Sequence, residues 1–142
     1  MATVSANYAR PTSEVATSNV DRVINILHWT YGLVPIVAGA DKFANILTDW
    51  SQYLAPFVAN IIPAHTFMMI VGVIEIIAGI IVLVRPKLGS LIVALWLVAI
   101  AINLLLTGQY FDVAVRDIVM AIGAFCLYTL LDDADMNRPT NN

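Results

Sequence analysis

The sequence has little charge and few groups that could bind nucleic acid. Of its 142 residues, 12% are charged and 60% are hydrophobic, and the formal net charge is −3 at neutral pH. A water-soluble domain of this size has too little interior to bury so many apolar side chains, so the composition indicates an integral membrane protein. The seven lysines and arginines are scattered and form no basic patch, which excludes a nucleic-acid partner.

Residues that hold metals and redox cofactors are also scarce. The one cysteine, Cys126, lies in an apolar run, so the chain has neither an internal disulfide nor a CxxC pair. His28 and His65 fall near opposite membrane faces, about 20 Å apart at 1.5 Å rise per residue, which is too far for a shared haem. Acidic residues never cluster with histidine at ligand spacing. We therefore predict no metal site, no catalytic residue and no intrinsic cofactor, in a chain that is not catalytic on its own.

Long apolar runs are what the sequence has in abundance. Four of them, residues 21–40, 66–84, 88–106 and 113–131, are long enough to cross a bilayer, which takes about 20 residues in a helix. They predict an all-α protein, an integral membrane four-helix bundle over residues 21–131. It is flanked by a polar N-terminal tail, 1–20, and an acidic polar C-terminal tail, 132–142, both expected to be poorly ordered or held by a partner.

The segment between the first two runs, residues 43–65, is too polar to span a membrane. Its apolar residues from Ile46 to Ile61 recur at three- and four-residue spacing. This pattern favours a short interfacial amphipathic helix between the first and second transmembrane helices. A loop anchored by Trp50 and Tyr53 as part of an aromatic belt is the alternative.

Basic residues near helix ends indicate the orientation of the protein in the membrane. They are Arg10 and Arg22 before the first run, Arg85 and Lys87 in the short turn between the second and third, and Arg138 in the C-terminal tail. Positive residues concentrate on the cytoplasmic side of membrane proteins. The sequence thus predicts a multi-pass protein of the inner (plasma) membrane with both termini in the cytoplasm.

A carboxylate stands between two glycines in the middle of the second run, in the stretch GVIEIIAG. Gly72, Glu75 and Gly79 lie on one face of a helix because the second and third follow the first by three and seven residues. The first run carries a similar stretch with Gly32 and Gly39 in the glycine positions. Small residues at this spacing let two backbones approach closely in lipid. We therefore expect the first and second helices to pack tightly around Glu75.

Glu75 lies near the middle of the membrane, where a charged side chain costs at least about 2.5 kcal/mol by insertion scales. It should therefore face the bundle and contact polar groups from the other helices. The candidates are Asp41, Lys42, Asn103, Arg116 and Asp117. The specific prediction is a pair of Glu75 with Arg116 across an offset of about 9 Å at 1.5 Å per residue, with water or Asn103 as the bridge.

Two interpretations of this polar cluster remain open at the level of the sequence. In the first, the ions form a buried network that only fixes how the helices pack. In the second, they form a site for a small polar head, such as a quinone carbonyl, or a proton relay. The residue types alone are compatible with both.

Four short motifs follow one another along the chain: GADKF at Gly39–Phe43, GxxExxxG at Gly72–Gly79, RP at Arg85–Pro86 and RD at Arg116–Asp117. Together they resemble the DoxX family of small four-helix bacterial membrane proteins, over about residues 23–131. The resemblance implies a four-helix membrane bundle and a link to quinol and thiosulfate oxidation. The polar positions of the family fall on Lys42, Glu75, Arg116 and Asp117.

The resemblance implies an accessory subunit of a membrane redox complex. Its ligand would be a quinone or a bound lipid, and partner subunits would carry the redox cofactors. A non-redox assembly, scaffold or lipid-handling protein with purely structural buried ions is the alternative. In both cases the expected partners are the lipid bilayer and either other membrane subunits or further copies of the chain.

Overall fold

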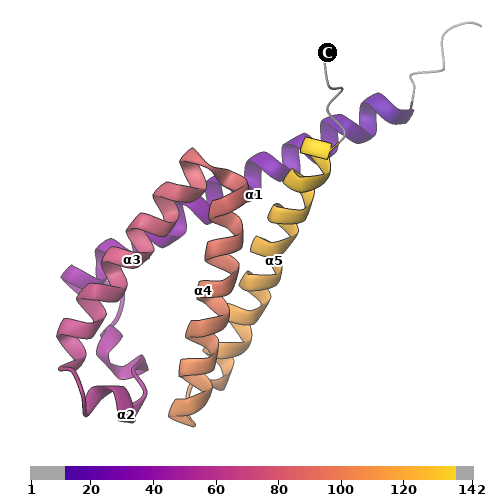
Figure 1. Ribbon diagram of the computed structural model, residues 1–142. Coiled ribbons are helices and arrows are strands. Elements are labelled where there is room, and N and C mark those ends of the chain that lie inside the picture. Colours follow the sequence, from indigo (N-terminus) through magenta and orange to yellow (C-terminus); the bar gives the residue numbers. More distant parts are fainter. Residues whose placement is uncertain (1–11, 137–142) are drawn as a thin grey trace, which may run out of the picture.

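Four long helices make up most of the chain that the structure describes, residues 12–136 (Figure 1). They are α1 (Thr12–Ala44), α3 (Ala64–Val84), α4 (Pro86–Thr107) and α5 (Phe111–Met136). In this computed structural model all four are long and apolar enough to cross a membrane, α1 over its part from Asn19 to Ala44. The prediction of an all-α four-helix membrane protein is confirmed, and residues 12–136 contain no strand.

Helices α1 and α5 extend beyond the apolar runs that predicted them. α1 already begins at Thr12, within the predicted tail of residues 1–20, and α5 continues past residue 131 to Met136. The last turn of α5 is tied to the start of α4, because Nζ of Lys87 lies 2.5 Å from Oδ1 of Asp132. The remaining tail predictions, for residues 1–11 and 137–142, lie outside the described residues.

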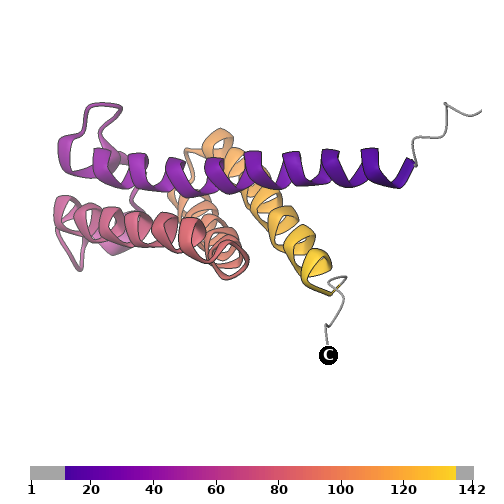
Figure 2. The same ribbon diagram turned by 90° about the horizontal axis from the view of Figure 1, so that it is seen from above.

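The helices are arranged as two pairs. α1 packs along α3, and α4 packs along α5, whereas α3 and α4 contact each other far less. Figure 2 shows α1 and α3 side by side, with α5 running away from them at an angle. The cavity described below lies between these two pairs.

Helices α3 and α4 meet closely at the turn that joins them. Arg85 leaves helical geometry, with φ −135° and ψ 76°, and Pro86 begins α4 at a position that needs no N–H partner. A side chain on Gly89 would overlap the backbone of Val82, so the two helices touch at this level. Away from the turn they diverge (Figure 1).

The connection from α1 to α3 consists of two short helical turns. A 3-10 turn, η1 (Trp50–Tyr53), and a four-residue helix, α2 (Pro56–Ala59), stand where one continuous amphipathic helix was predicted. Proline explains the interruption, because Pro56 lacks the N–H that would continue a helix from η1 and disfavours helical geometry in the residue before it. Ala55, just before α2, is completely buried, so the connection folds against the bundle.

Two hydrophobic clusters lie toward the two ends of the bundle. The cluster nearer the α3–α4 turn includes Val82, Val93 and Leu127, and the one nearer the α4–α5 connection includes Ala101 and Leu104. The helix pairs are also joined across the first cluster, where the Tyr31 hydroxyl donates to the carbonyl oxygen of Met120 at 2.7 Å. The polar residues of interest lie between these clusters.

Candidate functional site

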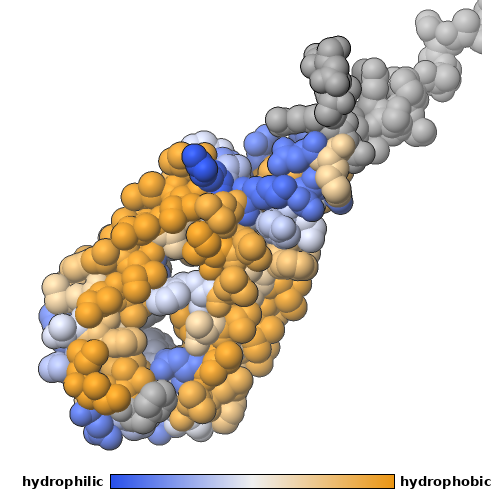
Figure 3. Space-filling view, viewed as in Figure 1, coloured by the Kyte–Doolittle hydropathy of each residue, from blue (hydrophilic) through white to orange (hydrophobic). Residues whose placement is uncertain are grey.

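A cavity of about 780 Å³ lies between the two helix pairs. Its wall is mostly apolar, but it includes five of the six predicted cluster residues: Lys42, Glu75, Asn103, Arg116 and Asp117. Figure 3 shows hollows between α3 and α4 on one face of the molecule. Sites for small molecules are concave, mostly apolar spaces of about 300–1,000 Å³ with a few polar groups, and the cavity fits this description.

The central polar contact is an ion pair between Lys42 on α1 and Glu75 on α3. Nζ of Lys42 lies 2.6 Å from Oε2 of Glu75, and the two side chains are 4% and 9% exposed. Removing either charge from so dry a place would leave the other without compensation. The midmembrane carboxylate is therefore neutralised by a cation from the neighbouring helix.

The predicted pairing of Glu75 with Arg116 is wrong. The Arg116 side chain is 67% exposed, and its Nε lies 3.8 Å from Oδ1 of Asp117, its neighbour in the sequence. Lys42 reaches Glu75 because α1 lies against α3, whereas α5, which carries Arg116, packs on α4. The prediction compared the depths of Glu75 and Arg116 in the membrane. It did not take into account which helices lie next to each other.

The four glycines predicted to serve helix packing form two close backbone contacts between α1 and α3. A Cβ atom on Gly39 would lie 2.5 Å from the carbonyl oxygen of Gly72, and a Cβ atom on Gly79 would lie 2.5 Å from that of Gly32. Such distances are sterically forbidden, so only glycine allows the two helices to approach this closely. The expected tight contact of the first and second transmembrane helices around Glu75 is present.

One of these glycines also makes room for the ion pair. A Cβ atom on Gly72 would lie 3.1 Å from Cβ of Lys42, so the lysine stem passes directly over this glycine. Lys42 stands three residues beyond Gly39 on α1, and its long side chain points back along α3 toward Glu75. The absence of a side chain at Gly72 therefore helps the Lys42 ammonium group to reach the Glu75 carboxylate.

Asp41, the sixth predicted residue, organises the end of α1. Its carboxylate accepts hydrogen bonds from the backbone N–H groups of Ile46 and Leu47 at 3.0 and 3.1 Å, and from Nε1 of Trp50 at 2.7 Å. The Trp50 ring lies over the Lys42 ammonium, with Nζ 3.8 Å from the ring centroid, which is a cation–π contact. Asp41 thus holds the Trp50 ring in place over the ammonium group of the ion pair. The sequence did not indicate this role of Trp50.

Asn103 connects the α1–α3 segment to α4. Its Nδ2 donates to the carbonyl oxygen of Tyr53 at 2.8 Å, and its Oδ1 accepts from the N–H of Ala55 at 3.2 Å. The Tyr53 ring also meets the Tyr110 ring edge-on, with centroids 4.7 Å apart. The amide is used to hold this end of the cavity together, not to bridge Glu75 and Arg116.

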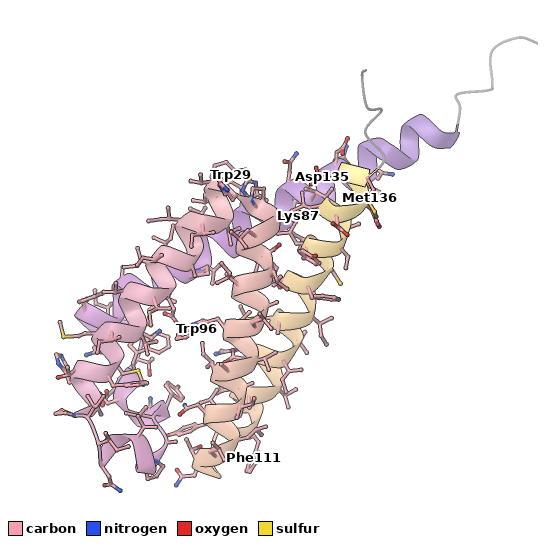
Figure 4. The ribbon with its side chains drawn as sticks, in the orientation of Figure 1. Trp29, Lys87, Trp96, Phe111, Asp135 and Met136 are labelled. Carbon is pink, nitrogen blue, oxygen red and sulfur yellow. The ribbon has the colours of Figure 1, made fainter. Side chains whose placement is uncertain are left out.

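Trp96 on α4 adds a polar group that sequence reasoning missed. Its Nε1 is buried and meets no acceptor at hydrogen-bond geometry among residues 12–136, although the indole lies near the Glu75 carboxylate. Figure 4 shows Trp96 pointing into the space between α3 and α4. The one available signal was its place in the middle of an apolar run, because membrane tryptophans usually lie at the interfaces.

Asp117 contributes an acceptor to the same cavity. The residue is 8% exposed, and its nearest described cation, Nε of Arg116, lies beyond normal hydrogen-bond length at 3.8 Å. The cavity therefore combines a neutralised ion pair, an indole donor and a carboxylate acceptor with an apolar wall. Such a set can bind an uncharged polar head attached to an apolar body.

No protein-family model matches the chain, and neither do the curated proteins or the solved structures with which it was compared. The residues of the cavity are therefore the guide to what it binds.

Proposed function

We propose that this small multi-pass membrane protein binds the head group of a quinone or quinol in the cavity between its helix pairs. The observation that carries the proposal is the buried Trp96 N–H, which lines an apolar cavity beside the Lys42–Glu75 ion pair. The Glu75 carboxylate lies near this N–H, but it is already paired with Lys42 and does not meet the N–H at hydrogen-bond geometry. A quinone carbonyl would supply an acceptor of better geometry on a flat, largely apolar ring.

The ion pair makes the cavity polar without giving it a net charge. Lys42 has three N–H groups; Glu75 accepts from one and the Trp50 ring lies over another side of the ammonium, which leaves a donor for an oxygen of the ligand. Asp117 offers an acceptor that suits the O–H group of a quinol. The cavity residues therefore match both the oxygen atoms and the uncharged ring of such a molecule.

We place the redox chemistry in partner subunits of the inner (plasma) membrane, with both termini of this chain in the cytoplasm. The sequence supports this division because its one cysteine and two widely spaced histidines leave no set of ligands for an electron carrier. The resemblance of the motifs around Lys42, Glu75 and Arg116 to the DoxX family supports the accessory role. The protein would hold or hand over the quinone, and a partner would oxidise or reduce it.

A non-redox assembly or lipid-handling role is the second candidate. It is favoured by the position of the ion pair, which lies directly beside the Gly39–Gly72 contact and therefore also joins α1 to α3. In that case Glu75→Gln would change the stability of the bundle and leave quinone binding and turnover by the complex unaltered. In the quinone-binding role, Glu75→Gln would also weaken quinone binding, and so would Lys42→Met/Glu75→Gln, which leaves no unpaired charge.

Photoaffinity labelling with an azido-quinone tests the head-group site. In lipid nanodiscs the label should map to peptides around Glu75 and Trp96, and excess unlabelled quinone should remove it. Trp96→Phe keeps an aromatic ring but removes the N–H, and should reduce labelling about three- to tenfold, the value of one hydrogen bond. Trp29→Phe, at a tryptophan that is 56% exposed, is the matched control and should label like the parent.

Labelling that spreads over outward-facing residues such as Val98 and Ile102, and that unlabelled quinone does not reduce, would overturn the head-group site. Gentle purification from the native membrane tests the accessory role separately. Haem or flavin subunits that copurify with the chain would support it. A homo-oligomer that carries only phospholipid would support the second candidate.

A further inference from the structure

We infer that a groove on the outer side of α3 and α4 holds the apolar tail of the molecule whose head occupies the cavity. The groove has a volume of about 260 Å³. It is lined by Ile74 and Ala78 of α3 and by Ile92, Leu95, Trp96 and Ala99 of α4. This inference rests on the proposed function and specifies its ligand as a quinone or quinol with a long hydrocarbon tail.

The groove and the cavity adjoin each other. Ala78, Trp96 and Ala99 line both, so these three residues stand between the two spaces. Figure 4 shows Trp96 in the space between α3 and α4, and Figure 3 shows the surface hollowed between the same two helices. A chain attached to a head group in the cavity would leave between the small side chains of Ala78 and Ala99.

The opening arises from the way α3 and α4 diverge. They touch where Gly89 meets Val82, next to the turn at Arg85. Ile92 follows Gly89 by less than one helical turn, so the groove begins where the two backbones separate. The two helices therefore touch next to the turn and lie farther apart beyond it (Figure 1).

The groove has the chemistry of a site for hydrocarbon. Its side chains are aliphatic except for the Trp96 indole, whose N–H is buried. The surrounding surface is also apolar, with Ile70 and Ile77 on α3 and Val98 and Ile102 on α4 exposed as lipid-facing residues would be. A bilayer-dissolved molecule could keep its tail in this surface while its head reaches the cavity, whereas a water-soluble molecule would lose its hydration without replacement.

Competition between two quinones with the same head tests the groove. One carries an isoprenoid tail, and the other carries a methyl group in its place; both compete with the azido-quinone in nanodiscs. Leu95→Trp fills the groove, and Ile102→Trp makes a similar change two turns farther along α4, outside the residues that line it. For each quinone, we compare the concentration that halves the labelling in the variant with the concentration that halves it in the parent. The quinone partitions into the bilayer equally in both samples, so the ratio of the two concentrations does not depend on partitioning.

The groove predicts that Leu95→Trp weakens the tailed quinone about tenfold, the loss of a few buried methylene groups, and leaves the tail-less quinone unchanged. Ile102→Trp should change neither. If Leu95→Trp melts below the parent, Ile74→Phe on the facing helix fills the same groove and carries the same expectation.

Equal competition by the tailed quinone in the parent and in both groove variants would overturn the groove and leave the head-group site standing. Equal weakening of both quinones in a folded groove variant would also overturn it, because the effect would then belong to the head. Failure of either quinone to compete in the parent would instead overturn the proposed function itself.

Discussion

Helix α3 meets its two neighbours in opposite ways. Toward α1 its backbone touches that of the partner at Gly72 and Gly79, and the Lys42–Glu75 ion pair is buried in the contact. We call this contact the closed seam. Toward α4 the closest backbone approach is at Gly89, and farther along the two helices lie the groove and the cavity, which we call the open gap.

The difference shows what holds helices together in lipid. The hydrocarbon around the protein is as apolar as the side chains, so no hydrophobic force draws two helices together and close packing must do so. α3 directs Gly72 and Gly79 toward α1, whereas Ile74 and Ala78 line the groove on the α4 side. An ion pair can stay dry in the closed seam, whereas the open gap leaves room for a ligand.

Removing one charge of the closed seam should have the largest effect on the free energy of unfolding. Lys42→Met leaves Glu75 buried without a counter-charge and should lower the free energy of unfolding by about 3–5 kcal/mol. The double variant Lys42→Met/Glu75→Gln has no unpaired charge and should recover most of the loss. Unfolding in mixed detergent micelles measures both.

Arg116→Ala is the matched control, because the Arg116 side chain is mostly exposed. It should change the free energy of unfolding by less than about 1 kcal/mol. If Arg116→Ala were as destabilising as Lys42→Met, Arg116 would be the partner of Glu75 and the closed seam would be misassigned.

A smaller effect is expected from enlarging one side chain on each side of α3. Gly39→Val places atoms where the Gly72 carbonyl oxygen lies, so it should cost about 3 kcal/mol by overpacking. Ala99→Val, at an exposed position in the wall of the open gap, should cost no more than about 0.5 kcal/mol. Melting in detergent compares the two, and equal losses would show that the gap is as tightly packed as the seam.

The smallest of the three effects is expected at the end of the open gap that lies farthest from the α3–α4 turn. Asn103→Ala removes the two hydrogen bonds to the backbone of Tyr53 and Ala55 and should cost about 1–2 kcal/mol. Hydrogen exchange at the Ala55 N–H should rise, because α4 no longer holds the connection. Gln52→Ala, which removes an exposed bond to Thr48, is the control and should leave that exchange rate unchanged. Unaltered exchange in Asn103→Ala would mean that something else holds the segment.

Helical periodicity accounts for what the sequence predicted correctly. The spacing of Gly72, Glu75 and Gly79 places them on one face whatever the rest of the fold does, so the closed seam followed from local geometry. The lengths of the apolar runs likewise predicted the membrane helices. The break in the α1–α3 connection could have been anticipated, because Pro56 falls inside the proposed helix.

The partner of Glu75 and the open gap depend on information that periodicity does not contain. Lys42 and Arg116 were both plausible partners by depth, and only the adjacency of α1 and α3 decides between them. The gap arises from the turn at Arg85 and the contact at Gly89, which set how α3 and α4 diverge. The position of Trp96 in the middle of its run is unusual for a membrane tryptophan, but only the divergence of α3 and α4 shows that it stands in the opening.

Quenching of tryptophan fluorescence by brominated lipid tests the open gap most directly. The emission of Trp96 is the difference between the parent and Trp96→Phe in nanodiscs, which removes the contributions of Trp29 and Trp50. Because Trp96 stands in an opening that faces the bilayer, lipids brominated near the middle of their acyl chains should quench this emission strongly, and lipids brominated near the head group should quench it less. A Trp96 emission that no brominated lipid quenches would mean that α3 and α4 are closed against each other, and would contradict the account.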